Sequence, residues 1–228
     1  MISIPKTGSF SSRKLLHEYA DIHSSVDPQS QYYMHKPASE LKKHFDRQGW
    51  YWNEYFKFTF VRNPWSQRAS YYLFFKKLCS IWVSRENPES LNEKELKLLE
   101  DLKQDPAAEK AWQDNLNYLK TIPTLTSYLK KTILNGHQDH LPQYNFFTDE
   151  SGQIIVDFVG QLECYQDDMN YVMRRIGLPM QPVLHHNSNP DTILNTVNKH
   201  TEAYDSESIE LVRELEQKVI EMFHYNVI

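Results

Sequence analysis

A short apolar run near the start of the chain leads directly into a glycine-containing loop and a predicted helix. The segment consists of Ile4-Pro5-Lys6-Thr7-Gly8-Ser9-Phe10-Ser11-Ser12. Gly8 allows backbone N–H groups to turn toward an anion, the helix start contributes the positive end of its dipole, and Lys6 supplies a full charge. Such a loop suits a phosphate or a sulfate, although a glycine after a strand is about as often a plain turn. It is not a Walker A loop, because the lysine precedes the glycine.

A second segment, further along the chain, has the same strand-to-helix pattern. Residues 56–61 are dense in aromatic and β-branched residues, as a buried strand requires. Asn63 suits the cap, and Pro64 the first position, of a following helix. Arg62 lies at the strand end, and Ser70 follows eight residues later on the helix. Because guanidinium binds phosphate oxygens bidentately, Arg62 and Ser70 form a second candidate anion site; the alternative is that Arg62 pairs with a carboxylate and Ser70 faces solvent.

Together the two segments resemble the sulfotransferases that use 3′-phosphoadenosine 5′-phosphosulfate (PAPS). The residues that carry this resemblance are Pro5-Lys6-Thr7-Gly8 and Phe60-Val61-Arg62-Asn63-Pro64-Trp65, with Ser70 beyond them. The closer similarity is to the branch of carbohydrate sulfotransferases and their bacterial relatives. Looser similarity over residues 143–149, 154–163 and 200–225 extends the resemblance to nearly the whole chain.

The resemblance implies which residues hold the sulfuryl donor. Those expected to hold the 5′-phosphosulfate are Lys6, Thr7, Gly8, Ser9, Phe10 and Ser11. The 3′-phosphate is expected at Arg62 and Ser70, with Lys199 as a third contact, and Trp65 either stacks on the adenine or lies in the core. Two positions depart from the family pattern, since Phe10 stands where Thr or Ser is usual and Gln161 stands where Arg is common.

Sulfuryl transfer needs a base for the acceptor and a positive group at the departing phosphate. Lys6 is the candidate for the second role. His35 follows a predicted strand where several relatives place a catalytic histidine, and neutral imidazole accepts a proton near neutral pH; the alternative is a surface histidine before a helix. Other histidines on predicted loops are His137, His140, His185 and His186. The spacing of His137 and His140 suits a metal, but no third ligand is evident, so we expect none.

Predicted strands and helices alternate along the chain. Strands are expected at about 2–4, 32–34, 57–61 and 153–159, and helices at about 9–20, 39–45, 65–78, 165–176 and 206–223. This order predicts a P-loop-like, three-layer α/β fold with a mostly parallel central sheet flanked by helices, whose ligands bind at the strand carboxyl ends. The 228 residues suit one domain, 1–228, in which the charged stretch at about 84–135 is an expected helical insertion or lid over the acceptor site.

Composition limits the partners and the compartment. A net charge of −5 argues against a nucleic-acid partner. The chain has no run of 18 apolar residues and no signal-peptide pattern, so we expect no membrane contact. Two cysteines without metal or redox spacing favour a reducing compartment, which predicts a cytoplasmic protein.

These observations predict a PAPS-dependent sulfotransferase (EC 2.8.2 type). It would move a sulfuryl group in one in-line step to a hydroxyl, or as a second choice an amine, of a small metabolite or saccharide. An ATP-dependent small-molecule kinase of related fold is one alternative, but its Walker lysine is missing. A non-catalytic nucleotide-binding protein is another, supported by Phe10 and Gln161. The sequence leaves the acceptor's identity and the oligomeric state open.

Overall fold

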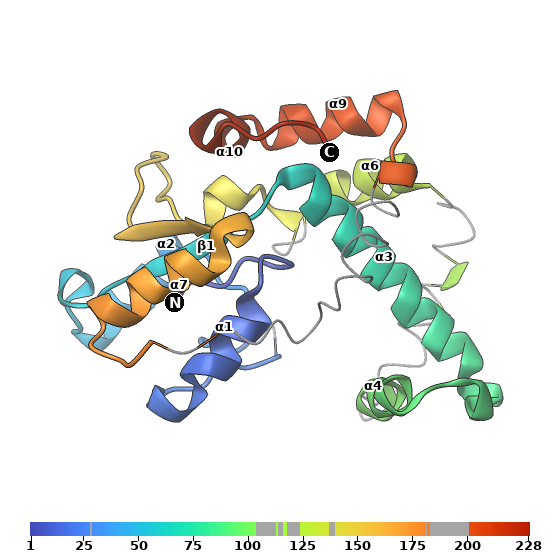
Figure 1. Ribbon diagram of the computed structural model, residues 1–228, viewed down its shortest axis with the longest axis horizontal. Helices are drawn as coiled ribbons and strands as arrows, with labels where there is room; N and C mark the ends of the chain where they lie inside the picture. Colours follow the sequence, from blue (N-terminus) through green and yellow to red (C-terminus); the bar gives the residue numbers. More distant parts are fainter. Residues whose placement is uncertain are drawn as a thin grey trace.

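The computed structural model describes residues 1–27, 29–103, 113, 116–117, 124–136, 140–180, 182 and 201–228. Helices surround a small parallel sheet, which confirms the expected α/β class (Figure 1). The strands are β1 (Phe58–Val61) and β2 (Phe158–Gln161), and the α-helices are α1 (Ser9–Leu16), α2 (Ala38–Gln48), α3 (Pro64–Val83), α4 (Glu93–Lys103), α6 (Leu125–Asn135), α7 (Tyr165–Arg175), α9 (Ser206–Leu215) and α10 (Gln217–Phe223). No described helix combines the length and the apolar character that a bilayer crossing requires.

The two strands pair in parallel over their whole length, with Phe58 opposite Phe158 and Val61 opposite Gln161. The N–H group of Ile2 donates to the carbonyl of Phe58 at 2.8 Å, so the N-terminal segment runs beside β1. Because the strands are parallel, the loops that follow them emerge at the same edge of the sheet. That edge is where the two candidate anion segments meet.

Several expected elements differ from those observed. Residues 2–4 form no regular strand, and residues 32–34 contribute only an isolated bridge between Ser25 and Tyr33. The expected strand 153–159 becomes regular only at Phe158, and the expected helix 206–223 is divided at Glu216. The predicted strands at 2–4 and 32–34 are therefore wrong, because a strand needs a partner that continues the ladder of hydrogen bonds, and the predictions for 153–159 and 206–223 are correct only in part.

Buried side chains on both sides of the sheet hold the helices in place. Phe60 packs with Tyr165 and Met169, which joins the sheet to α7. Ile4 and Val61 belong to a second buried cluster, with residues of the 141–156 segment packed on it. A third cluster joins α3, α6 and α9, and in Figure 1 α9 and α10 lie along one side of the molecule above α3.

The start of α3 follows the sequence signals closely. The side-chain oxygen of Asn63 accepts a hydrogen bond from the N–H of Ser66 at 3.2 Å, and Pro64 is the first helical residue. This cap fixes the direction in which α3 leaves the end of β1. The first turn of α3 therefore begins at the edge of the sheet where β1 ends.

Candidate active site

The first anion segment forms a tight turn before α1. Gly8 has a φ of 80° and Lys6 a φ of 65°. Glycine adopts a positive φ readily, whereas for lysine this conformation is unfavourable and needs support from its surroundings. The Thr7 hydroxyl donates to the carbonyl of Ile4 at 2.9 Å, which ties the turn together from within.

Gly8 also lies against the end of β2. A Cβ atom at this position would be 2.7 Å from Cδ1 of Leu162. Nearby, the hydroxyls of Ser12 and Tyr165 are 2.6 Å apart, which joins α1 to the start of α7. Glycine is therefore required here both for its φ and for the close approach of the neighbouring segment.

Lys6 and Arg62 lie next to each other where the two anion segments meet. Nη1 of Arg62 donates to the backbone carbonyl of Lys6 at 3.3 Å, and Nζ of Lys6 is 4.1 Å from the centroid of the Phe74 ring. Burial, and then the charge of Arg62, lower the pKa of Lys6 to about 8. Burial also lowers the pKa of Arg62, an effect that Glu163 and Tyr225 oppose. A bound anion would relieve the repulsion between these two cations.

The side chain of Gln143 holds the backbone of Arg62 in place. Its Oε1 accepts from the N–H of Arg62 at 2.9 Å, and its Nε2 donates to the Arg62 carbonyl at 2.9 Å. Gln143 is fully buried. The sequence similarity covers Gln143 but assigns it no role, because its partner, Arg62, is 81 residues away in the chain.

One face of α3 contacts the first anion segment. Nε2 of Gln67 donates to the carbonyl of Pro5 at 2.8 Å, and Phe74 contacts Lys6. Ser70 lies three residues after Gln67 and four before Phe74, which places it on the same helical face. Ser70 therefore lies on the face of α3 that contacts the loop, and Arg62 contacts the loop through its hydrogen bond to the Lys6 carbonyl.

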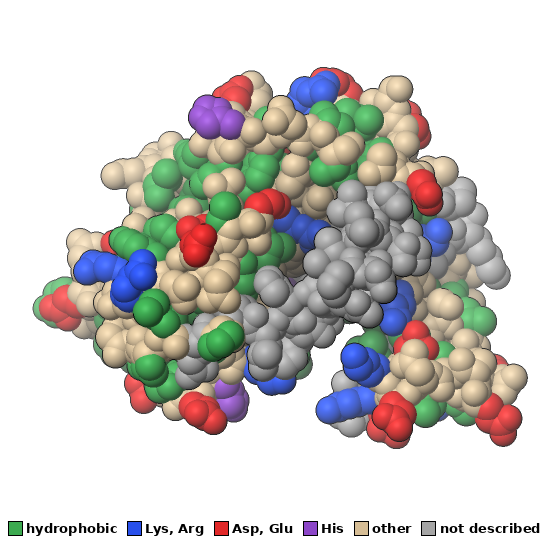
Figure 2. All heavy atoms as spheres, viewed as in Figure 1, with side chains coloured by type: hydrophobic (Ala, Val, Ile, Leu, Met, Phe, Trp, Pro, Cys, Tyr) green, Lys and Arg blue, Asp and Glu red, His purple; other side chains and the backbone are tan. Residues whose placement is uncertain are grey.

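The remaining loop residues differ in exposure. Ser9 is buried at the first position of α1, and Ser11 is partly exposed. The Phe10 side chain is 62 % exposed. On the face drawn in Figure 2, Lys and Arg side chains lie inside the hollow at the centre of the molecule.

His35 is tied to the segment that leads into the loop. Its Nδ1 is 3.0 Å from the carbonyl oxygen of Ser3, and its ring meets that of Tyr33 edge-on. A carbonyl only accepts hydrogen bonds, so Nδ1 carries the proton and Nε2 is the basic nitrogen of the neutral ring. This is the tautomer in which Nε2 can accept a proton from a substrate.

Other expected site residues are placed elsewhere or lie outside the described residues. Trp65 is buried and donates from Nε1 to the carbonyl of Ile209, so it is a core residue and not an adenine-stacking surface. His140 packs against Tyr71 and Tyr128. The expected residues that lie outside the described part are Lys199, His137, His185 and His186. The described residues contain no group of three or more His, Cys, Asp or Glu side chains arranged for a metal ion.

Comparison with known proteins gives one family. The family model described as "Sulfotransferase family" matches residues 2–226. Neither the curated proteins nor the solved structures compared with the chain include a significant match. The family match confirms the resemblance that the two anion segments indicate. Because it covers nearly the whole chain, the protein belongs to the sulfotransferase family of enzymes.

Proposed function

We propose that the protein transfers a sulfuryl group from PAPS to a hydroxyl group of a small metabolite or saccharide. The observation that carries this proposal is the contact between Lys6 and Arg62 at the start of α1. Two partly buried cations beside backbone N–H groups form a site for a ligand with more than one anionic group. PAPS has such groups at its 5′ and 3′ positions.

Each anion segment has a distinct role in this proposal. The turn and first helical residues, Lys6 to Ser11, hold the 5′-phosphosulfate through backbone N–H groups and the hydroxyls of Ser9 and Ser11. The Phe10 side chain is exposed and has no hydroxyl, so the hydroxyl contacts to the phosphosulfate come from Ser9 and Ser11. Arg62 and Ser70 hold the 3′-phosphate, and Lys199 remains an expected third contact.

His35 accepts the proton that the acceptor loses, and Lys6 balances the negative charge of the leaving group. PAPS supplies the activated sulfuryl group. Nε2 of His35 takes the proton of the acceptor hydroxyl as the acceptor oxygen forms its bond to sulfur and the bridging S–O bond breaks. The Lys6 ammonium neutralises the charge that develops on the departing phosphate oxygen. No metal has a role in these steps.

Calorimetric titration of 3′-phosphoadenosine 5′-phosphate (PAP), ATP and AMP tests the donor assignment. We expect PAP to bind most tightly, and Arg62→Ala to weaken PAP binding roughly ten- to hundredfold, as loss of a charged hydrogen bond does. Arg213→Ala is the matched control, because Arg213 is exposed on α9 and pairs with Glu210. Equal affinity for the three nucleotides would contradict the proposal, and PAP binding without turnover of PAPS would favour the non-catalytic alternative.

A further inference from the structure

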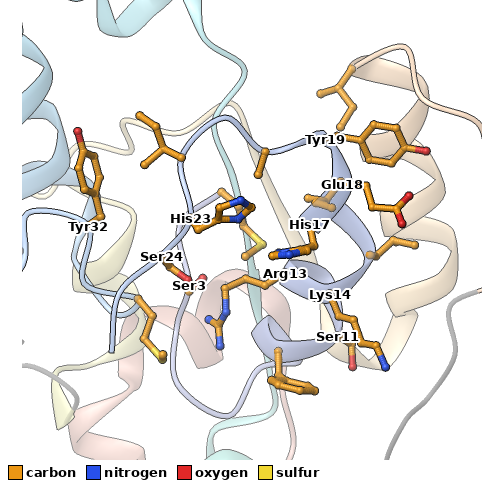
Figure 3. Close-up of a pocket in the computed structure, with 18 of the residues that line it drawn as sticks. Ser3, Ser11, Arg13, Lys14, His17, Glu18, Tyr19, His23, Ser24 and Tyr32 are labelled. Carbon is orange, nitrogen blue, oxygen red and sulfur yellow. The ribbon is translucent and has the colours of Figure 1, made fainter. Parts of the chain in front are cut away.

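A pocket of about 1150 Å³ adjoins the first anion segment along α1 (Figure 3). Phe10 and Ser11 belong both to the anion segment and to the pocket lining. Ser3, whose carbonyl oxygen lies against His35, also lines the pocket. The lining therefore includes part of the donor loop and Ser3, the residue that holds the ring of His35, but not His35 itself.

We infer that this pocket binds the acceptor, and that it selects an acceptor with an apolar body and an anionic group held by Arg13. The inference rests on the proposed function and narrows its substrate class. An uncharged saccharide is the acceptor class that it disfavours.

The walls of the pocket are largely apolar. Aliphatic residues from α1, the following loop, α2 and the end of α7 contribute Leu15, Leu16, Ile22, Leu41, Ile176 and Leu178. Such walls bury hydrocarbon or aromatic surface favourably, and polar side chains that include His17, His23 and Tyr32 also line the pocket. The body of the ligand is therefore apolar.

Arg13 supplies the polar anchor. Its Nη1 is buried and has no hydrogen-bond partner among the described residues. Figure 3 shows the guanidinium extending from α1 across the pocket toward the side that carries Ser3. An unpaired buried donor is costly, and a carboxylate, sulfate or phosphate on the ligand would remove that cost by accepting charged hydrogen bonds from the guanidinium.

The charge of the lining agrees with an anionic ligand. Lys14 and Lys36 also line the pocket, whereas Glu18 is the one carboxylate among the lining residues. Lys36 lies 4.0 Å from Glu40, so its charge is partly balanced, whereas Arg13 has no ion pair within the described part of the chain. The field in the pocket is positive around Arg13.

Two matched probes test the inference: 12-hydroxydodecanoate and its methyl ester, titrated by calorimetry in the presence of PAP. We expect the acid to bind at least tenfold more tightly than the ester, and Arg13→Met to remove this preference while keeping the apolar stem. Arg13→Lys should keep part of the preference. Arg213→Met, which removes an exposed charge on α9, should keep all of it.

PAP titration of the same proteins separates the possible failures. Arg13→Met should bind PAP as wild type does, which also shows that the variant is folded. If wild type binds PAP but binds acid and ester equally, or binds neither, the inference is overturned and the donor assignment stands. If wild type does not bind PAP but prefers the acid through Arg13, the proposed function fails and the acid site stands. Faster sulfuryl transfer to methyl glucoside than to the acid would overturn the acceptor class.

Discussion

At the scale of single residues, the site depends on Lys6. Its positive φ is unfavourable for a residue with a side chain, and its ammonium is buried beside Phe74 and Arg62. The sequence indicated the charge of Lys6 and of Arg62. It did not indicate Phe74, Gln67 or Gln143, since each of these meets the site only after distant segments pack.

The lowered pKa of Lys6 predicts how donor binding varies with pH. In the proposed function the protonated form of Lys6 binds the anion, and burial and Arg62 lower the Lys6 pKa to about 8. Below that pH the lysine is charged and affinity is at its full value; above it the neutral form accumulates, so PAP affinity should fall by up to about tenfold per pH unit. PAP titrations between about pH 7 and 9.5 measure this, because its phosphates, whose second pKa is about 6, are already largely ionised at the lower end of that range.

Lys6→Arg is the control for the pH dependence. Arginine keeps its charge throughout this range, so the slope above about pH 8 should disappear even if the affinity itself is lower. A wild-type affinity that stays constant from about pH 7 to 9.5 would show that Lys6 does not bind the anion as the charged form.

At the scale of elements, the site is a junction between the loop before α1, the end of β2 and one face of α3. Asn63 and Pro64 begin α3 as the sequence predicts, because a cap is a local arrangement. The close approach of Leu162 to Gly8 is not local, and it distinguishes Gly8 from the other glycines with a positive φ, none of which has a neighbour so near.

Gly8→Ala should therefore be more damaging than Gly49→Ala. Both glycines have a positive φ, but a Cβ on Gly49 would meet nothing within 4 Å. Gly49→Ala should cost only the conformational strain, roughly 1–2 kcal/mol. Gly8→Ala should cost about 1–3 kcal/mol more, since Leu162 must move, and it should also weaken PAP binding. Urea denaturation and PAP calorimetry measure the two effects; equal destabilisation with intact PAP binding would contradict this account.

At the scale of the whole molecule, a buried ion pair joins α3 to the C-terminal helices. Arg68 donates to Glu216 and to the carbonyls of His140 and Leu141, and Glu216 also accepts from the N–H of Gln143 at 3.0 Å. Burial raises the pKa of Glu216, and Arg68 opposes that shift. Glu216 lies between the end of α9 and the start of α10. The pair therefore connects this boundary to Gln143, whose side chain holds the backbone of Arg62.

Breaking this pair should destabilise the protein strongly. Arg68→Met leaves a buried carboxylate without its cation and should lower the free energy of unfolding by about 3–5 kcal/mol, whereas Arg68→Met with Glu216→Met should recover much of that loss. Lys130→Met is the control, since its exposed pair with Glu207 should contribute less than about 1 kcal/mol. Urea denaturation of wild type, Arg68→Met, Glu216→Met, the double variant and Lys130→Met decides it: losses in the double variant equal to the sum of the two single losses would show that Arg68 and Glu216 do not act as a pair.

The single domain over 1–228, with a helical insertion or lid at about 84–135, remains a prediction. Within that range the structure has α4 and α6, both helical as expected. The role of this stretch over an acceptor depends on contacts between segments, which a charged helical pattern does not specify.

The sequence by itself determined the family, the α/β class and the positions of the two candidate anion segments, because these depend on residues close together in the chain. A glycine turn, a helix cap and an apolar strand are each encoded within a few positions. Only the tertiary structure decided which residues complete the site: Gln143 at Arg62, Phe74 at Lys6, and Arg13 in a pocket of apolar walls. Their roles follow from burial and from pairing between distant segments, and neither quantity exists until the chain has folded.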